Sequence, residues 1–219
     1  MVSEPTFHSP AGPSPFWLST PRTTAKRLID FLLSGALLIV LAPLLALLAL
    51  LVKTTSRGPT FYRWRVVGKD GMTFVSYKFR SMVANADELK SKLTSQNEMT
   101  GPVFKITRDP RITRPGAWMR RYSLDELPQL YSVFIGDMSL VGPRPPLVTE
   151  YERFTDFQKQ KLTVKPGITC LWQVSGRNRV SDFDDWVRLD LEYIHNWSLM
   201  LDARILLQTV REVFRGSGK

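Results

Sequence analysis

The longest apolar run of the chain lies near its N-terminus. The stretch from Phe31 to Val52 carries no charged side chain, and a helix needs about 20 apolar residues to cross the hydrocarbon core of a bilayer. A cleaved signal peptide is disfavoured, because the run is long, begins late and is followed by basic residues. Residues 1–25 are rich in Pro, Ser and Thr and predict a flexible leader. We therefore expect attachment to a membrane.

The flanks and the centre of this run leave two topologies open. Basic residues at 26–27 precede it, and Lys53 and Arg57 follow it. Positive residues tend to stay on the cytoplasmic side, so both ends favour the same side. Pro43 removes a backbone hydrogen bond in the middle of the run, where a broken helix could turn back. These residues alone allow a re-entrant hairpin over 26–56 or a kinked spanning helix.

The remaining chain, residues 57–219, has the pattern of a small α+β domain that is mostly helical. Short aromatic and β-branched stretches flank Asp70-Gly71, which predicts a β-hairpin. Apolar spacing predicts helices. The predicted helices are a polar one at 84–93, one from Leu124 to Phe134, and two within 182–214 divided near 196–198; loops are expected at 101–116, 142–146 and 164–180.

Composition narrows the possible chemistry. The 219 residues include 30 Lys and Arg against 20 Asp and Glu, a net charge of +10. This excess suits an anionic partner, either nucleic acid, an anionic lipid surface or a phosphorylated substrate. Cys170 is the single cysteine, which excludes an intrachain disulfide and a zinc site built on cysteines. With only His8 and His195 besides, carboxylates and arginines must carry any catalysis.

Asp125 and Glu126 are adjacent acids in this basic chain, shortly after Arg120. Two capping roles are open for them. Ser123 and Glu126 could form a capping box, or Asp125 could be the cap and place Pro128 in the first helical turn. Either arrangement puts both carboxylates at a helix N-terminus, where the helix dipole favours negative charge. Capping accounts for one acid and leaves the second without a role.

The same position suits phosphate chemistry. A helix N-terminus with an arginine nearby binds phosphate. A carboxylate placed there can attack phosphorus and form an acyl phosphate, and its neighbour can hold Mg²⁺, which neutralises phosphate oxygens. An Asp-Glu dipeptide is by itself a weak signal, since most lie on solvated surface. The functional interpretation assigns a nucleophile and a metal ligand to the pair.

Other basic residues are candidates for phosphate contacts. Arg144 lies between prolines, and its guanidinium fork suits phosphate oxygens, although bonds to loop carbonyls are the simpler explanation. Lys78 and Arg80 are two residues apart on an extended stretch and therefore lie on one face. They could bind phosphate groups or lipid headgroups.

A nucleotide could bind near Trp172. Lys165 and Arg177 flank this aromatic residue, so stacking on the ring could combine with phosphate contacts. A core Trp with charged surface neighbours is the commoner arrangement for such a pattern.

Six stretches carry a resemblance to a known family. They are KRLIDFLLSGALLIVLAPLL, YKFRSM, DPRIT, SLDELPQLYSVFIGDMSLVGPRPP, KPGITCLWQVSGRN and YIHNWSLMLDARILLQT. Together they span about residues 26 to 210 and resemble the bacterial sugar transferases, small monotopic polyprenyl-phosphate phosphoglycosyl transferases. The combination of LDELPQL with GDMSLVGPRP is the most specific part of the match.

The resemblance implies a reaction and a topology. Family members transfer a sugar-1-phosphate from a nucleotide sugar, usually a UDP-sugar, to undecaprenyl phosphate and release UMP. By motif, Asp125 is expected to form a covalent phosphosugar intermediate, Glu126 to help bind Mg²⁺, and Arg120 and Arg144 to engage phosphate. The apolar run around Pro43 is expected to be a re-entrant helix-break-helix in the bacterial inner membrane.

The remaining domain is then expected to lie on the cytoplasmic face of that membrane, with interfacial helices. The enzyme would act in the first membrane step of exopolysaccharide, lipopolysaccharide or other glycoconjugate assembly. The stretch LWQVSGRN has a weak resemblance to family members that use galactose. Membrane lipids are expected partners, nucleic acid is not, and a homo-oligomer is possible.

Two positions depart from the family pattern. Ala42 precedes Pro43 where the family often has Ser, so a hydroxyl that could satisfy freed backbone groups is missing. Cys170 replaces the second glycine of the family's PGITG pattern, and its larger side chain could reshape the loop and alter nucleotide-sugar preference.

Three other functions compete with the transferase. One is a membrane-tethered scaffold of polysaccharide assembly with an idle Asp-Glu pair. Another is a membrane-anchored nucleic-acid-binding protein, although no such module is recognisable and the basic residues are dispersed. The third is a plain glycosyltransferase that releases UDP. Activity of an Asp125→Asn variant distinguishes the scaffold, and the released nucleotide distinguishes the glycosyltransferase.

Overall fold

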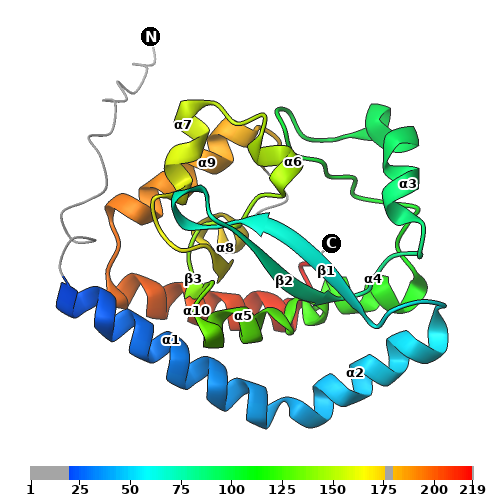
Figure 1. The fold of residues 1–219 in the computed structure, drawn as a ribbon, viewed down its shortest axis with the longest axis horizontal. Helices are drawn as coiled ribbons and strands as arrows, with labels where there is room; N and C mark the ends of the chain where they lie inside the picture. The colour runs from blue at the N-terminus through cyan, green and yellow to red at the C-terminus, as the bar shows by residue number, and fades with distance from the viewer. Residues whose placement is uncertain (1–19, 176–179, 219) are drawn as a thin grey trace.

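A bent pair of helices runs along one edge of the molecule (Figure 1). The computed structural model describes residues 20–175 and 180–218. Helix α1 (Thr20–Val40) and helix α2 (Ala42–Thr55) meet at Leu41 and are bent by 63°. Among these residues no single helix is long and apolar enough to cross a membrane, whereas the bent pair together passes that test. The helical break expected at Pro43 is confirmed, and Pro43 lies in the first turn of α2.

Helix α1 begins at Thr20, earlier than the boundary expected after residue 25. The rest of the predicted leader, residues 1–19, lies outside the described residues. The missing hydroxyl at Ala42 does not prevent the bend. The backbone N–H of Leu41 donates to the carbonyl of Leu37 at 2.9 Å, so hydrogen bonding continues into the break.

The predicted hairpin is confirmed. Strands β1 (Phe61–Val67) and β2 (Thr73–Phe79) pair antiparallel. Asp70 and Gly71 both adopt positive φ in the connecting turn (η2, Lys69–Gly71), a conformation that Asp tolerates and Gly adopts freely. The pairing places Trp64 opposite Ser76 and thereby sets which side chains share a face with Lys78.

The segment after the hairpin matches the prediction in part. The expected polar helix is present as α3 (Ala86–Lys90), continued by η3 (Ser91–Gln96). The loop expected over 101–116 is wrong at its end, because α4 (Arg114–Arg121) begins within it. The Thr113 side chain caps this helix by accepting the backbone N–H of Gly116, and a proline in its first turn fits the helix start.

The region around the two acids differs from both capping predictions. Asp125 and Glu126 lie in a 3₁₀ turn, η4 (Leu124–Glu126), that precedes α5 (Gln129–Ile135). Ser123 has left-handed φ and its side chain makes no cap bond, so the capping box is wrong. Asp125 is not the cap either, because Pro128 occupies the N-cap position of α5. The orientations of the Asp125 and Glu126 side chains are therefore set by the 3₁₀ turn, and these residues do not cap α5.

A second, parallel strand pair was not expected. Strand β3 (Ser139–Val141) pairs with β4 (Gly167–Thr169), and β4 lies inside the stretch 164–180 that was expected to be a loop. The loop expected at 142–146 follows β3 directly and is confirmed. The two predicted C-terminal helices are also confirmed, as α9 (Phe183–His195) and α10 (Leu199–Arg215), and the short elements α6 (Val148–Tyr151), α7 (Asp156–Lys159), η5 (Gln160–Leu162) and α8 (Leu171–Val174) connect the strands to them.

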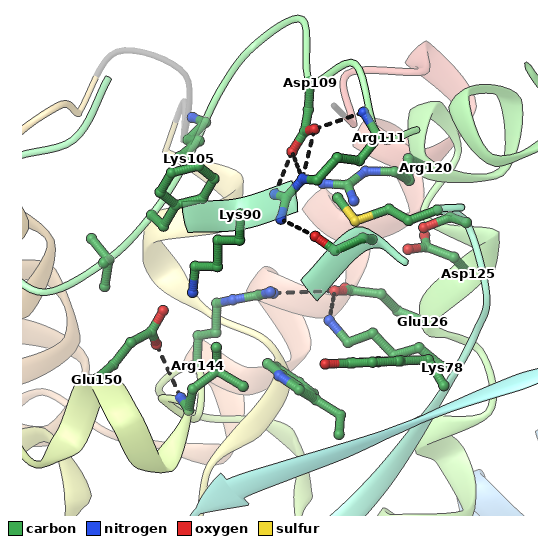
Figure 2. Close-up of a pocket in the computed structure, with 18 of the residues that line it drawn as sticks. Lys78, Lys90, Lys105, Asp109, Arg111, Arg120, Asp125, Glu126, Arg144 and Glu150 are labelled. Carbon is green, nitrogen blue, oxygen red and sulfur yellow. Dashed lines mark hydrogen bonds and ion pairs between the residues drawn. The ribbon is translucent and has the colours of Figure 1, made fainter. Parts of the chain in front are cut away.

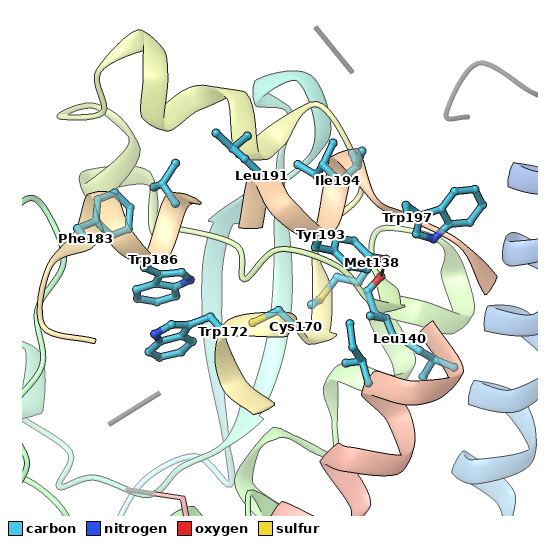
Figure 3. Packing of buried hydrophobic residues seen from close by; sticks show 14 of the residues in the cluster. Met138, Leu140, Cys170, Trp172, Phe183, Trp186, Leu191, Tyr193, Ile194 and Trp197 are labelled. Atoms are coloured by element: carbon cyan, nitrogen blue, oxygen red, sulfur yellow. Dashed lines mark hydrogen bonds between the residues drawn. The ribbon is translucent and has the colours of Figure 1, made fainter. Parts of the chain in front are cut away.

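An aromatic core joins these elements (Figure 3). The Trp172 and Trp186 rings stack with centroids 3.9 Å apart, and Phe183 meets the Trp186 ring edge-on. Burial of such large side chains is the main favourable contribution to folding. Cys170 lies in the same core with a buried thiol, so the residue that departs from the family pattern packs inward.

A buried polar network attaches α1 to the rest of the protein. Lys26 Nζ lies 2.6 Å from Asp202 Oδ2 and donates to the Val141 carbonyl at 3.1 Å. The Tyr193 hydroxyl and the Trp197 indole also donate to Asp202, at 2.8 and 3.2 Å. Because buried charges need partners, this network holds the start of α1 in one orientation.

Candidate active site

One cavity of about 640 Å³ brings most of the predicted site residues together (Figure 2). Its walls come from the β1–β2 hairpin, the connector before α4, the η4 turn and the loop after β3. The predicted site residues that line it are Lys78, Arg80, Arg120, Asp125, Glu126, Arg144 and Trp172. Residues far apart in the chain therefore form one basic pocket around two acids.

Asp125 is a buried carboxyl group, 8% exposed. Burial raises its pKa, and the neighbouring negative charge of Glu126 raises it further. The positive charges of Lys78 and Arg120 act in the opposite direction without reversing the shift. The ionised carboxylate is consequently more basic than that of an exposed aspartate, and a more basic oxygen is a stronger nucleophile.

Two cations hold Glu126. Lys78 Nζ lies 2.7 Å from Glu126 Oε1, and Arg144 Nη1 lies 3.1 Å from the same oxygen. Burial lowers the pKa of Lys78 to about 8, despite the attraction of Glu126. For Arg144, burial also lowers the pKa, but the contact with Glu126 outweighs it and the net shift is upward. The three side chains form a cluster, named here the Glu126 clamp.

The loop that carries Arg144 is fixed at both ends by backbone contacts. The N–H of Val67 in β1 donates to the Pro146 carbonyl at 3.0 Å, and the N–H of Gly167 donates to the Pro143 carbonyl at 2.9 Å. A Cβ on Gly167 would lie only 2.1 Å from the backbone nitrogen of Gly142, so only glycine permits this approach. The hairpin and the parallel strands together place the guanidinium.

Arg80 connects the cavity to the bent helix pair. Its Nη2 donates to the carbonyl and hydroxyl oxygens of Ser56, both at 2.8 Å, directly after α2. The Nε and Nη1 atoms are buried and have no hydrogen-bond partner among the described residues. Lys78 lies in β2 and Arg80 directly follows the strand, and both side chains line the cavity.

The remaining predicted residues have different positions. Trp172 lines the cavity but is stacked on Trp186, so one face of its indole is occupied. Lys165 is not among the residues that line the cavity, and its amine donates to the Gly136 carbonyl at 2.6 Å, beyond the end of α5. The structure therefore does not bring Lys165 to the acids. Arg177 lies outside the described residues.

Sequence reasoning missed several groups that the cavity contains. Arg111 forms a forked pair with Asp109, with Nη2 at 2.6 Å from Oδ2 and Nε at 2.9 Å from Oδ1. The Asp-x-Arg spacing within DPRIT is the signal that could have found this pair, since two residues suffice for the fork. Trp64 and Lys90 also line the cavity, and nothing in their immediate sequence indicates a site.

The residue predicted to bind Mg²⁺, Glu126, lines the cavity next to Asp125. Among the described residues no group of three or more His, Cys, Asp or Glu side chains could hold a metal ion. Mg²⁺ is usually held by one or two protein carboxylates together with water and substrate phosphates. Glu126, in a cavity of about 640 Å³ that has room for substrate phosphates, fits such a shared site, and the described residues offer no site built from protein ligands alone.

Comparison with known proteins identifies the family. The bacterial sugar transferase family matches residues 21–216. The chain belongs to the bacterial sugar transferase family. The family resemblance of the sequence motifs is thus confirmed, and it extends through both C-terminal helices.

Several curated relatives are similar to this family member. Galactosyl transferase CpsE of Streptococcus agalactiae is 46% identical over 89% of the chain and 43% of the relative. Undecaprenyl-phosphate galactose phosphotransferase of Salmonella typhimurium is 45% identical over 88% of the chain and 41% of the relative. The chain thus spans about two fifths of these proteins. Exopolysaccharide production protein ExoY of Sinorhizobium fredii is 40% identical over 89% of the chain and 87% of its own length.

Proposed function

We propose that this bacterial sugar transferase moves a sugar-1-phosphate from a UDP-sugar to undecaprenyl phosphate and releases UMP. The observation that carries the proposal is Asp125, a buried and unusually basic carboxylate in a cavity lined by cations. Relatives named undecaprenyl-phosphate galactose phosphotransferase and UDP-glucose:undecaprenyl-phosphate glucose-1-phosphate transferase support the substrate classes.

In the first step, a carboxylate oxygen of Asp125 attacks the phosphorus that carries the sugar. A new P–O bond forms to Asp125, and the bond to the bridging oxygen of the diphosphate breaks. UMP leaves with that electron pair, and an aspartyl phosphosugar remains. Arg120 and the Glu126 clamp supply positive charge close to the attacked phosphate, which offsets the repulsion between two anions.

In the second step, a phosphate oxygen of undecaprenyl phosphate attacks the same phosphorus. The P–O bond to Asp125 breaks, the carboxylate is regenerated, and the product is undecaprenyl-diphosphate-sugar. Splitting the transfer into two displacements lets one carboxylate serve both the donor and the lipid acceptor. Arg80 would contact the phosphate of the lipid acceptor, which is supported by its bond to Ser56 directly after α2 and its position in the cavity wall.

Glu126, next to the nucleophile Asp125, is the residue that would hold Mg²⁺, together with the diphosphate of the donor. Bound there, Mg²⁺ would neutralise phosphate oxygens and stabilise the departing UMP. Glu126 Oε1 contacts Lys78 and Arg144 in the structure, so a bound metal would share the carboxylate with these two cations. Lys78 and Arg144 orient the Glu126 carboxylate in either situation.

The bent helix pair is proposed to enter the cytoplasmic leaflet of the bacterial inner membrane and to leave on the same side. Ile39 and Val40 next to the break are 77% and 72% exposed, and Leu47 and Leu50 are also exposed. A hydrocarbon environment would cover these side chains. The start of helix α10 is joined to α1 by the Lys26–Asp202 pair, and α10 exposes Phe214 at 83%, which suits an interfacial helix.

The test is the identity of the released nucleotide. Purified protein in detergent receives Mg²⁺, undecaprenyl phosphate and either UDP-galactose or UDP-glucose, the two sugars that the names of relatives contain. UMP release is expected, and Asp125→Asn should abolish it. Asp70→Asn in the exposed hairpin turn is the matched control and should retain activity.

Other results would contradict the proposal. Release of UDP would indicate a plain glycosyltransferase. Full activity of the Asp125→Asn variant would remove the covalent step. Folded protein without any nucleotide product, with donors of other bases also tried, would favour a scaffold in polysaccharide assembly.

A further inference from the structure

The indole of Trp64 lies close to both cations of the Glu126 clamp. Lys78 Nζ is 3.7 Å from the centre of the Trp64 ring, and the Arg144 guanidinium carbon is 5.2 Å from it. Both distances fall within the roughly 6 Å range of cation–π attraction, for which Trp is the strongest partner. Trp64 is 7% exposed, so water screens these contacts little.

The hairpin register makes this arrangement possible. Trp64 in β1 pairs with Ser76 in β2, which puts Lys78 diagonally next to the indole on the same face. The loop that carries Arg144 reaches the same strand through the hydrogen bond from Val67 to Pro146. A single ring therefore contacts one cation from its own hairpin and one from a loop far away in the sequence.

The attraction of the Trp64 ring offsets a repulsion between the two cations of the clamp. Lys78 and Arg144 both bond the same oxygen of Glu126, and their like charges repel each other. The negative face of an indole attracts both cations, and their N–H groups remain available to donate hydrogen bonds to Glu126. We propose that Trp64 is a positioning residue that holds Lys78 and Arg144 on Glu126 and thereby keeps this carboxylate in its working orientation.

The inference rests on the proposed function, because its main readout is UMP release. Trp64→Leu and Trp64→Met keep an apolar side chain and remove the ring. The cation–π energies of about 0.5 to 2 kcal/mol correspond to a loss of roughly 2- to 30-fold in kcat/KM. Trp64→Phe keeps a weaker aromatic face and should recover part of that loss. Phe74→Leu, which replaces an aromatic residue of the same hairpin that packs on the core, is the matched control.

A double-mutant cycle separates positioning from a general effect on folding. In a Lys78→Met background most of the cation–π contribution is gone, so Trp64→Leu should cost clearly less than it does in wild type. Equal costs in both backgrounds would overturn the inference, as would wild-type activity of both aliphatic variants or failure of Trp64→Phe to recover any activity. Inactive wild-type protein would instead contradict the proposed function.

Thermal unfolding of each variant completes the test. Variants whose unfolding midpoints match that of Phe74→Leu but whose kcat/KM is lower support positioning. A loss of activity that follows the loss of stability across Leu, Met and Phe would show that Trp64 is only a packing residue, and would overturn the inference.

Discussion

Replacement of Lys26 by Met tests how firmly the first helix is attached to the catalytic domain. Lys26 and Asp202 are both buried, at 8% and 7% exposure, with 2.6 Å between amine and carboxylate. Removing one partner of a buried pair typically costs about 3–5 kcal/mol, because the other charge stays buried. Tyr193 and Trp197 still donate to Asp202 in the variant, so we expect the lower value, about 3 kcal/mol.

The magnitude can be measured as a shift of the thermal unfolding midpoint. For a chain of this size each kcal/mol lowers the midpoint by about 2–4 °C, so Lys26→Met should lower it by roughly 6–12 °C. Far-ultraviolet circular dichroism of protein in detergent micelles records the transition. Lys69→Met removes an exposed amine and should shift the midpoint by less than about 2 °C.

A second variant tests the reason for the loss. Adding Asp202→Asn to Lys26→Met removes the uncompensated charge and should recover part of the lost stability. The reasoning is refuted if Lys26→Met unfolds at the temperature of Lys69→Met. It is also refuted if the double variant is less stable than Lys26→Met alone, because the buried charge would then not be the cause.

Three further predictions concern other groups. The pKa of Lys78 is about 8 in the folded protein, below its value of about 10.4 in the unfolded chain. With Mg²⁺ chelated, the free energy of unfolding should therefore rise between pH 8 and about 10.4, by up to roughly 3 kcal/mol more than in the Lys78→Met variant. Urea titrations that show no such gain over Lys78→Met would contradict this prediction. Cys170 has a buried thiol whose pKa is raised to about 12 by burial, so a maleimide should label it only after denaturation; mass spectrometry of labelled native protein would reveal the opposite result. In a Cys170→Ser background, cysteines introduced at Thr24 and Arg57 should both resist an impermeant maleimide in spheroplasts and react after lysis, whereas labelling of one in spheroplasts would indicate a spanning helix.

Local sequence signals predict much of the fold. The hairpin turn at Asp70-Gly71 and the helix pair divided near residue 197 depend on neighbouring residues, and both are confirmed. Helix α4 escapes prediction because Pro115 and Gly116 suggest a loop, although a proline is compatible with the first helical turn. Strands β3 and β4 have three residues each and pair across a long separation, so their stretches carry no usable periodicity.

The residues of the candidate site also divide into some that the sequence predicts and others that it does not. The motif around Asp125 and Glu126 identifies the acids, and the roles expected of them come from the resemblance of that motif to the family. The 3₁₀ turn that directs them was not predictable, because it depends on the left-handed backbone of Ser123. Trp64 was missed because its contacts come from a neighbouring strand and a distant loop, which no local pattern contains.

The most direct test of the central claim is to trap the intermediate on Asp125. Protein is mixed with Mg²⁺ and UDP-galactose or UDP-glucose without undecaprenyl phosphate, quenched rapidly and weighed by mass spectrometry. The account predicts a mass increase of one phosphosugar, located to the peptide with Asp125, together with a burst of UMP of no more than one per protein. Addition of undecaprenyl phosphate should then remove the adduct. Formation of the lipid product at full rate with no adduct at any quench time, or an adduct that persists in Asp125→Asn, would contradict the account.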